Sequence, residues 1–237
     1  MASITNKQQA LTQLVVGLKK HYDPAPPREL PVLEQLIYGV LREGTTVELA
    51  DQAFTNLTQR FFDWNEIRVS LPPEVAEALG ELPDAAAKAE RIIGILQEVF
   101  EKFFAFKIDE IDKKGLKNAA RKLQEMKDVT DFTVAWVVQR SLGGHAIPLD
   151  APSLRVLRRL GVIDEESENL DTLRATLEHY VPKAKGPMFA DAIAQIGKET
   201  CWDEEPHCAR CALRGECPTG QERKNSEPRT PRKPRQP

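Results

Sequence analysis

Four cysteines lie within one short segment near the C-terminus, in the order Cys201-x6-Cys208-x2-Cys211-x5-Cys217. Four thiolates from one compact loop can hold the four irons of a cubane cluster. A structural zinc site usually joins two Cys/His pairs across a longer insert, whereas a single C-x-x-C is closely flanked here. The spacing therefore favours a 4Fe–4S cluster, with zinc or free thiols as alternatives. His207 is a competing ligand, but it adjoins Cys208 and is expected to point elsewhere.

The cellular setting follows from composition. No apolar run approaches the roughly 20 residues that span a bilayer, and the first residues lack the pattern of a secretory signal. Because the cytosol keeps thiols reduced, a disulfide framework is not expected. We expect a cytoplasmic protein, nucleoid-associated if bacterial, that is monomeric and has no membrane partner.

Charge is unevenly distributed along the chain. The net charge is −3, but the segment from Gln221 to Pro237 carries +4, which leaves −7 for the rest. A basic, Pro-rich tail is disordered by composition and can contact DNA or another polyanion, or can simply aid solubility. A second cationic group lies on one face of a predicted helix; it comprises Lys113, Lys114, Lys117, Arg121 and Lys122.

Apolar residues recur at helical spacing through most of the chain, and no segment shows the alternation of a strand. The expected fold class is therefore all-α. Thr46 and Asp150 each precede an amphipathic run and are predicted helix N-caps. The predicted helices lie around 11–18, 33–41, 46–61, 75–79, 92–103, 116–126, 132–142, 150–160, 173–180 and 188–196.

The cysteine spacing at the end of a helical chain resembles the endonuclease III (HhH-GPD) superfamily of iron–sulfur DNA glycosylases. The resemblance extends from about Leu11 to Cys217. Lys-Ala-Glu-Arg-Ile-Ile at 88–93 resembles that family's K-A-x-x-I-I helix start. The segment 147–161, with Asp150 followed by Leu-Arg-Val-Leu-Arg-Arg-Leu-Gly, resembles its V-D-T-H-V-x-R-V-x-x-R-L-G segment.

The resemblance implies a bilobal fold in which DNA binds between the lobes and a damaged base is flipped into a pocket there. An N-terminal helix (1–30) would pack on a C-terminal 4Fe–4S cluster domain (146–220). A six-helix domain with a degenerate helix–hairpin–helix would occupy 31–145, and a basic disordered tail 221–237. A 4Fe–4S cluster would be the cofactor and DNA the partner, with a protein partner as the alternative.

Several family features are replaced. Asp128 and Thr130 stand where the hairpin has glycines that let backbone N–H groups approach a phosphate. Phe132 aligns with the lysine that attacks the sugar, and Lys127 lies off that helix face. Gly44 aligns with the glutamine that fills the space left by the flipped base. The catalytic glutamate of the adenine-removing branch aligns with Val40, so the glutamate of that branch is also missing here.

Asp150 matches the family's carboxylate, which stabilises positive charge on the sugar and assists the nucleophile. Helix capping is the simpler role for this residue, and the two can coexist. The resemblance thus implies a DNA-repair-type protein that is at most a monofunctional glycosylase acting through Asp150, without AP lyase activity. The alternative is a catalytically inactive 4Fe–4S protein that serves as a binding module.

Overall fold

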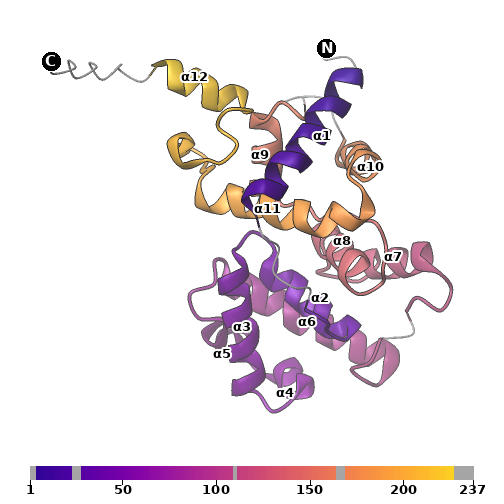
Figure 1. Cartoon of the computed structure of the whole chain (residues 1–237). Helices are drawn as coiled ribbons and strands as arrows, with labels where there is room; N and C mark the ends of the chain where they lie inside the picture. Colours follow the sequence, from indigo (N-terminus) through magenta and orange to yellow (C-terminus); the bar gives the residue numbers. More distant parts are fainter. Residues whose placement is uncertain (1–3, 23–27, 109–110, 164–168, 227–237) are drawn as a thin grey trace, which may run out of the picture.

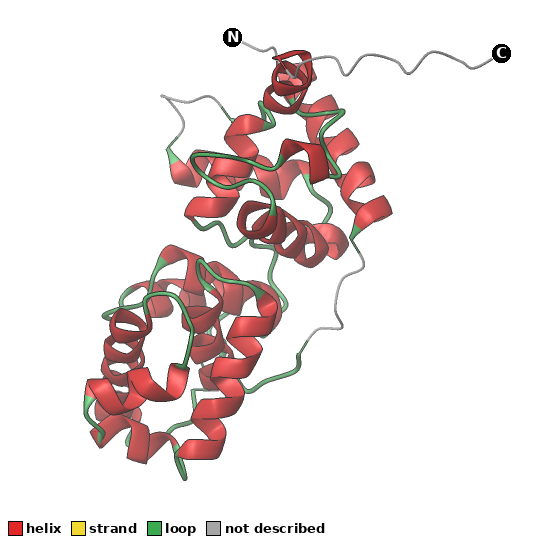
Figure 2. Cartoon of the chain, turned by 90° about the vertical axis from the view of Figure 1, so that its left-hand side faces the viewer, coloured by secondary structure: helices red, strands yellow, loops and turns green. Residues whose placement is uncertain are grey.

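The computed structural model describes residues 4–22, 28–108, 111–163 and 169–226. Every regular element in these ranges is a helix (Figure 2), so the all-α fold class is confirmed. No helix in the described ranges is long and apolar enough to cross a membrane. The helices are α1 (Ile4–His21), α2 (Val32–Arg42), α3 (Val47–Arg60), α4 (Trp64–Val69), α5 (Pro72–Leu79), α6 (Ala85–Phe103), α7 (Leu116–Gln124), α8 (Asp131–Arg140), α9 (Ala151–Arg159), α10 (Leu170–Tyr180), α11 (Gly186–Glu199) and α12 (Pro218–Ser226), with 3-10 turns η1 (Lys183–Lys185) and η2 (Cys208–Arg210).

The helices form two bodies, each around its own apolar core (Figures 1 and 2). One core draws its buried side chains from α2 to α8 and the segments between them, from Val32 to Val138. The other combines α1 with the chain from Ile147 to Leu213. The chain therefore passes from one body to the other after α1 and returns after α8.

Helix α8 is largely buried in the first body. Its residues from Phe132 to Val138 are all buried, as the nearly continuous apolar run predicts. The indole N–H of Trp136 donates to Gln35 Oε1 on α2 at 2.9 Å, which satisfies a polar group inside the core. The hydrogen bond therefore joins α8 to α2 inside the first core.

Both predicted N-caps are confirmed. Thr46 Oγ1 accepts from the Leu49 N–H at 3.4 Å, and Asp150 Oδ1 accepts from the Ser153 N–H at 2.9 Å. Each bond satisfies one of the N–H groups that a helix start leaves unpaired. These two caps fix where α3 and α9 begin.

Two helices differ from the sequence prediction. The short helix α4 was not expected, because six residues cannot display a periodic apolar stripe; its start is capped by Asp63, which accepts from Glu66 N at 2.8 Å. The segment from Gln221 was predicted to be disordered, but α12 runs to Ser226. Pro218 suits a first helical turn, and Gln221 N donates to Cys217 O at 2.9 Å. The remainder of the predicted tail, 227–237, lies outside the described residues.

Candidate functional site

The four cysteines occupy the loop between α11 and α12. Cys201 follows α11 by one residue, Cys208 begins η2, Cys211 follows η2, and Cys217 precedes α12. Arg159 at the end of α9 faces this loop, donating from Nη1 to Cys201 Sγ at 3.4 Å and accepting from Cys217 Sγ at its carbonyl at 3.2 Å. The loop is thereby held against α9.

The thiols share one partly buried environment. Burial raises the pKa of Cys211, and Cys201 and Cys208 raise it further. Burial likewise raises the pKa of Cys217, with Cys201 and Cys211 adding to the effect. Among the described residues no three His, Cys, Asp or Glu side chains stand as a preassembled metal site. The four thiols nevertheless fit a 4Fe–4S cluster in donor type and number.

His207 lies beside these thiols but faces an aromatic neighbour. Its ring is tilted against that of Trp202, with centroids 4.4 Å apart. This contact is compatible with the expectation that His207 points away from the cysteine group.

Asp150 stands at the junction of the two bodies. Its carboxylate is buried and accepts three hydrogen bonds, from Ser153 N at 2.9 Å, Ser153 Oγ at 2.5 Å and Gly44 N at 3.0 Å. The first two cap α9, whereas the third reaches the turn between α2 and α3. Asp150 also interacts with Lys198 on α11. Burial lowers the pKa of Lys198, and the negative charge of Asp150 partly offsets that effect. The carboxylate is therefore fixed in position by donors from both bodies.

The same α2–α3 turn is joined to the hairpin region before α8. Glu43 Oε2 lies 2.9 Å from Arg91 Nη1 and accepts from Thr130 Oγ1 at 2.9 Å. Arg91 Nε also donates to the Asp128 carbonyl at 3.1 Å. Arg91 thus holds the segment that matches the hairpin against the turn that holds Asp150.

Asp128 adopts a left-handed backbone conformation, with φ of +66°. A backbone conformation that favours glycine is therefore adopted here by an aspartate, a residue that tolerates this region better than most. Its carboxylate packs close to Gly94 on α6, where an added Cβ would lie 2.5 Å from Asp128 Oδ2. This turn therefore carries a negative charge at a position of left-handed backbone.

Phe132, at the position of the family's lysine, is a core residue. Its side chain is 4 % exposed and stacks on Trp136, with ring centroids 6.1 Å apart and an angle of 19° between the planes. A phenyl ring offers no nucleophile, and this one is packed into the core of the first body.

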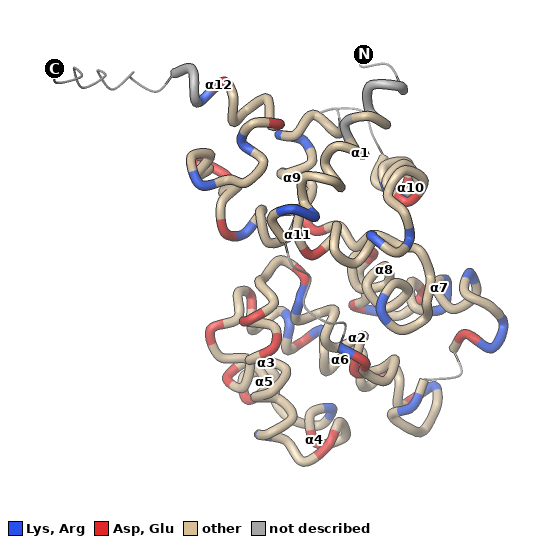
Figure 3. Tube along the Cα trace, viewed as in Figure 1, with Lys and Arg blue, Asp and Glu red and all other residues tan. Residues whose placement is uncertain are grey.

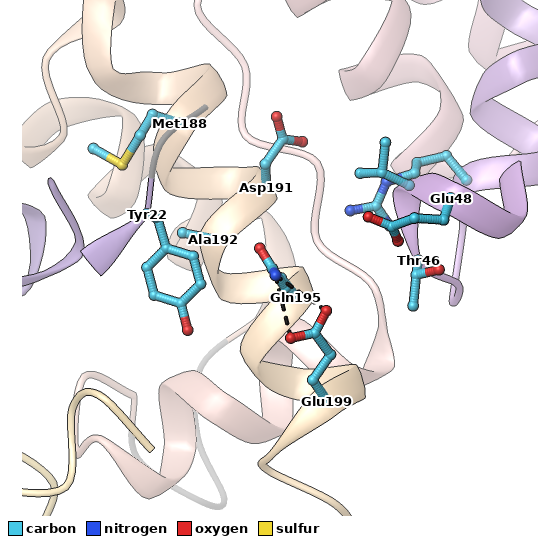
Figure 4. Close-up of a pocket in the computed structure, with 10 residues that line it drawn as sticks. Tyr22, Thr46, Glu48, Met188, Asp191, Ala192, Gln195 and Glu199 are labelled. Atoms are coloured by element: carbon cyan, nitrogen blue, oxygen red, sulfur yellow. Dashed lines mark hydrogen bonds between the residues drawn. The ribbon is translucent and has the colours of Figure 1, made fainter. Parts of the chain in front are cut away.

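A cavity of about 230 Å³ lies between the two bodies (Figure 4). Arg42 and Thr46, on either side of Gly44 in the sequence, belong to its wall, so the cavity adjoins the turn that contacts Asp150. In Figure 4 the side chains of α11 face those of the α2–α3 turn across the opening. The lining residues are Tyr22, Arg42, Thr46, Val47, Glu48, Met188, Asp191, Ala192, Gln195 and Glu199.

Several polar groups of the cavity wall have defined partners. Asp191 pairs with Arg140 at 2.9 Å, which joins α11 to α8. Gln195 Nε2 donates to both Glu199 oxygens at 3.0 and 3.2 Å. Arg42 is 1 % exposed and donates from Nη1 to the Thr45 carbonyl, yet its Nε has no hydrogen-bond partner in the described part of the chain. A buried donor without an acceptor is uncommon in folded proteins.

The predicted cationic face is present on and before α7. Figure 3 shows blue segments along this part of the chain. Three of the five predicted residues, Lys114, Lys117 and Arg121, line a surface concavity of about 590 Å³. Arg121 also pairs with Glu125 on its own helix at 3.2 Å. Lys117 and Lys122 share α7 with Arg121, whereas Lys113 and Lys114 precede the helix.

Sequence reasoning missed the groups that surround Asp150 and the cavity. Glu43, Arg91 and Thr130 are far apart in sequence, and no local pattern joins them. Asp191, Gln195 and Glu199 do recur at i, i+4 and i+8, a polar stripe on a helix that is otherwise largely buried. Two sequence signals could have indicated the cavity residues: this polar stripe, and the charged Arg42 at the end of an apolar helix.

Comparisons with known proteins identify relatives. No family model matches the chain. An endonuclease III of Synechocystis sp. (strain ATCC 27184 / PCC 6803 / Kazusa) is 24% identical over 227 residues, which cover 93% of this chain and 97% of the relative. An endonuclease III of Thermotoga maritima is 22% identical over 194 residues, with 82% and 86% covered.

Solved structures give the same result for the fold. A non-covalent endonuclease III–DNA complex superposes with a TM-score of 0.72 at 21% identity, covering 95% of this chain and 100% of that chain. A trapped endonuclease III–DNA covalent intermediate gives 0.71 at 21% identity, covering 94% and 100%. The chain therefore has the fold of the endonuclease III-like DNA glycosylases.

Proposed function

We propose that this chain, which belongs to the endonuclease III (HhH-GPD) superfamily of DNA glycosylases, is a DNA-repair-type protein with at most monofunctional base-excision activity. In this proposal the cavity between the two bodies receives the flipped base. Asp150 then stabilises the positive charge that develops on the sugar as the base leaves.

The observation that carries the proposal is the hydrogen bond between Asp150 and the α2–α3 turn, two residues of which line the cavity. The Gly44 N–H donates to its carboxylate, and the residues flanking Gly44 form part of the cavity wall. Three hydrogen bonds hold the carboxylate before any ligand binds, and such preorganisation is what electrostatic stabilisation of a transition state requires.

The absence of AP lyase activity is the second part of the proposal. Lyase chemistry needs an amine that attacks the sugar and forms a Schiff base. Phe132 occupies the position that matches the family's lysine, and its side chain is buried against Trp136. Strand cleavage by that route is therefore not expected.

The cofactor and the domain organisation are also proposed. Cys201, Cys208, Cys211 and Cys217 would hold one 4Fe–4S cluster, supported by their donor type and shared environment. The N-terminal helix (1–30) and residues 146–220 would form the cluster domain, and residues 31–145 the six-helix domain. The presence of two separate apolar cores supports that division.

For DNA contact, we propose the concavity at α7. Lys114 and Lys117 would contact phosphates, because a lysine on a surface neutralises phosphate charge without reading the sequence. Replacing both with alanine should weaken binding to every duplex and lower the slope of log affinity against log salt by about 2. Replacing Glu101 with glutamine, away from this concavity, should leave the slope unchanged.

The proposed activity is tested with duplexes that each carry one oxidised, deaminated or alkylated base. Base release is measured under single turnover for the natural chain and for Asp150→Asn. We expect release from at least one duplex and its loss in the variant. Release that is undiminished in Asp150→Asn would contradict the assigned role.

A second candidate is a catalytically inactive 4Fe–4S protein that binds DNA or a protein partner. The specific observation in its favour is that both Asp150 oxygens already accept hydrogen bonds within the protein. In that case the carboxylate serves only to cap α9 and join the two bodies. No duplex in the panel would then release a base, while lesion-blind DNA binding would persist.

A further inference from the structure

The cavity beside Asp150 has a wall in which hydrogen-bond acceptors predominate. Glu48, Asp191 and Glu199 contribute three carboxylates, against the single guanidinium of Arg42. Gln195 adds to the acceptors, because its amide nitrogen is directed at Glu199 and its Oε1 is left to accept. A phosphate would be repelled by such a wall. What fits is a neutral or cationic group with hydrogen-bond donors.

The rim and the floor of the cavity differ. Glu48, Gln195 and Glu199 are exposed, whereas Met188 and Ala192 are buried. The floor is therefore apolar, and the rim is polar. A flat ring can cover the apolar floor while its edge meets the rim, which is the usual composition of a small-ligand site.

The wall also supplies donors at defined points. The Arg42 guanidinium belongs to the wall and can donate to a ligand acceptor, while its Nε is buried without a partner in the described structure. Tyr22 lines the same wall, and its phenolic hydroxyl is a hydrogen-bond donor at neutral pH. A matching ligand edge has a donor for the carboxylates and an adjacent acceptor for such groups.

We infer that the cavity selects a base whose edge carries an amino group next to a ring nitrogen, as in cytosine or adenine and their derivatives. An imide edge, as in uracil or thymine, would place carbonyl oxygens against carboxylates and is disfavoured. This inference rests on the proposed function for the identity of the ligand as a base. It goes beyond that function by naming the class of base.

Glu48 is the residue that discriminates. It lies in the first turn of α3, its side chain is exposed, and no hydrogen bond or ion pair is assigned to it in the described structure. It can therefore accept from an incoming amino group without first breaking a protein contact. Asp191, in contrast, is already paired with Arg140.

The inference is tested with the full-length protein and free bases. Fluorescent 2-aminopurine, which has an amino group beside ring nitrogens, is titrated first and then displaced by cytosine or by uracil, two bases of the same ring size. We expect cytosine to compete at about tenfold lower concentration, the usual effect of one hydrogen bond to a charged group. Glu48→Gln should remove most of that preference, and the control Glu101→Gln should retain it.

Three results would overturn the inference: no binding of 2-aminopurine, equal competition by the two bases, or a preference that survives Glu48→Gln. The duplex panel separates this inference from the proposed function. If cytosine competes better but no duplex releases a base, the preference for an amino-bearing base stands and the glycosylase proposal fails. If a uracil-type base is released efficiently, the glycosylase proposal stands and the preference for an amino-bearing base fails.

Discussion

The backbone N–H of Gly44 donates to Asp150 Oδ2 at 3.0 Å, joining two residues that are 106 positions apart in sequence. The contact connects the α2–α3 turn of one body to the N-cap residue of α9 in the other. Because the same carboxylate caps α9, one side chain sets both a helix start and the relation between the two bodies. Asp150 therefore contributes to the stability of the fold whether or not it takes part in catalysis.

Replacing Asp150 with alanine should therefore lower the free energy of unfolding by about 2 kcal/mol or more, through loss of a cap and of the acceptor for Gly44 N. Asp63→Ala is a matched control, because it removes a cap from α4 that makes no contact between the bodies. Its cost should be about 1 kcal/mol. Equal losses in the two variants, measured by chemical denaturation, would show that the Gly44 contact adds no stability.

The packing of α11 on α9 gives a second prediction. A Cβ on Gly197 would lie 2.8 Å from Pro152 Cβ and 2.9 Å from the Pro152 carbonyl oxygen. Since the backbone cannot move aside cheaply, Gly197→Ala should destabilise the chain by about 1–3 kcal/mol. Gly215→Ala, where an added Cβ meets nothing within 4 Å, should change the melting temperature little. Similar melting temperatures for both variants would argue against the close approach of α9 and α11.

Lys88 predicts a pH dependence. It is 5 % exposed, donates to the Leu41 and Glu43 carbonyls at 2.8 and 2.6 Å, and burial lowers its pKa from 10.5 to about 8. Between pH 8 and 10.5 Lys88 is therefore more protonated in the unfolded chain than in the folded one. The free energy of unfolding should rise with pH across this range, by about 3 kcal/mol in total. Below pH 8 this contribution should be constant.

The measurement compares the natural chain with Lys88→Met by denaturation from pH 7 to 10.5, because subtraction removes the effect of the other titrating groups. The free energy of unfolding of the natural chain, relative to that of Lys88→Met, should increase as pH rises. A difference that does not change with pH would mean that Lys88 titrates normally.

Metal content tests the cysteine assignment. Anaerobically purified protein should contain about four irons per chain and be brown. Cys208→Ser or Cys211→Ser should lose the iron and destabilise the body that contains α9 and α11, because metal binding contributes to folding free energy. His207→Ala should keep the iron. Stoichiometric zinc without iron, from an iron-replete host, would exclude the cluster.

How far the sequence predicts the structure depends on the range of the interaction. Periodic apolar spacing and local caps such as Thr46 and Asp150 are short-range signals, and the helices that they predict are present. Helix α4 is too short to show a period. The helical turn before Ser226 depends on Pro218 and on a bond to Cys217, which composition alone does not reveal.

The candidate site was less predictable, because its contacts join distant segments. Asp150 could be singled out from its helix start, but its bond to Gly44 could not. Similarly, the sequence shows that Asp128 replaces a hairpin glycine, but it does not reveal that Arg91 and the α6 packing at Gly94 accommodate an aspartate with positive φ. Tertiary contacts outweigh a local conformational preference at this turn.

The central claim, base excision without lyase activity, is tested most directly by one assay on a duplex from which the protein releases a base. Products are read with and without alkali, and a parallel reaction on abasic DNA receives borohydride. We predict strand breaks only after alkali and no covalent protein–DNA adduct, because Phe132 replaces the amine. A trapped adduct that disappears when one lysine is replaced would contradict the account and identify the nucleophile.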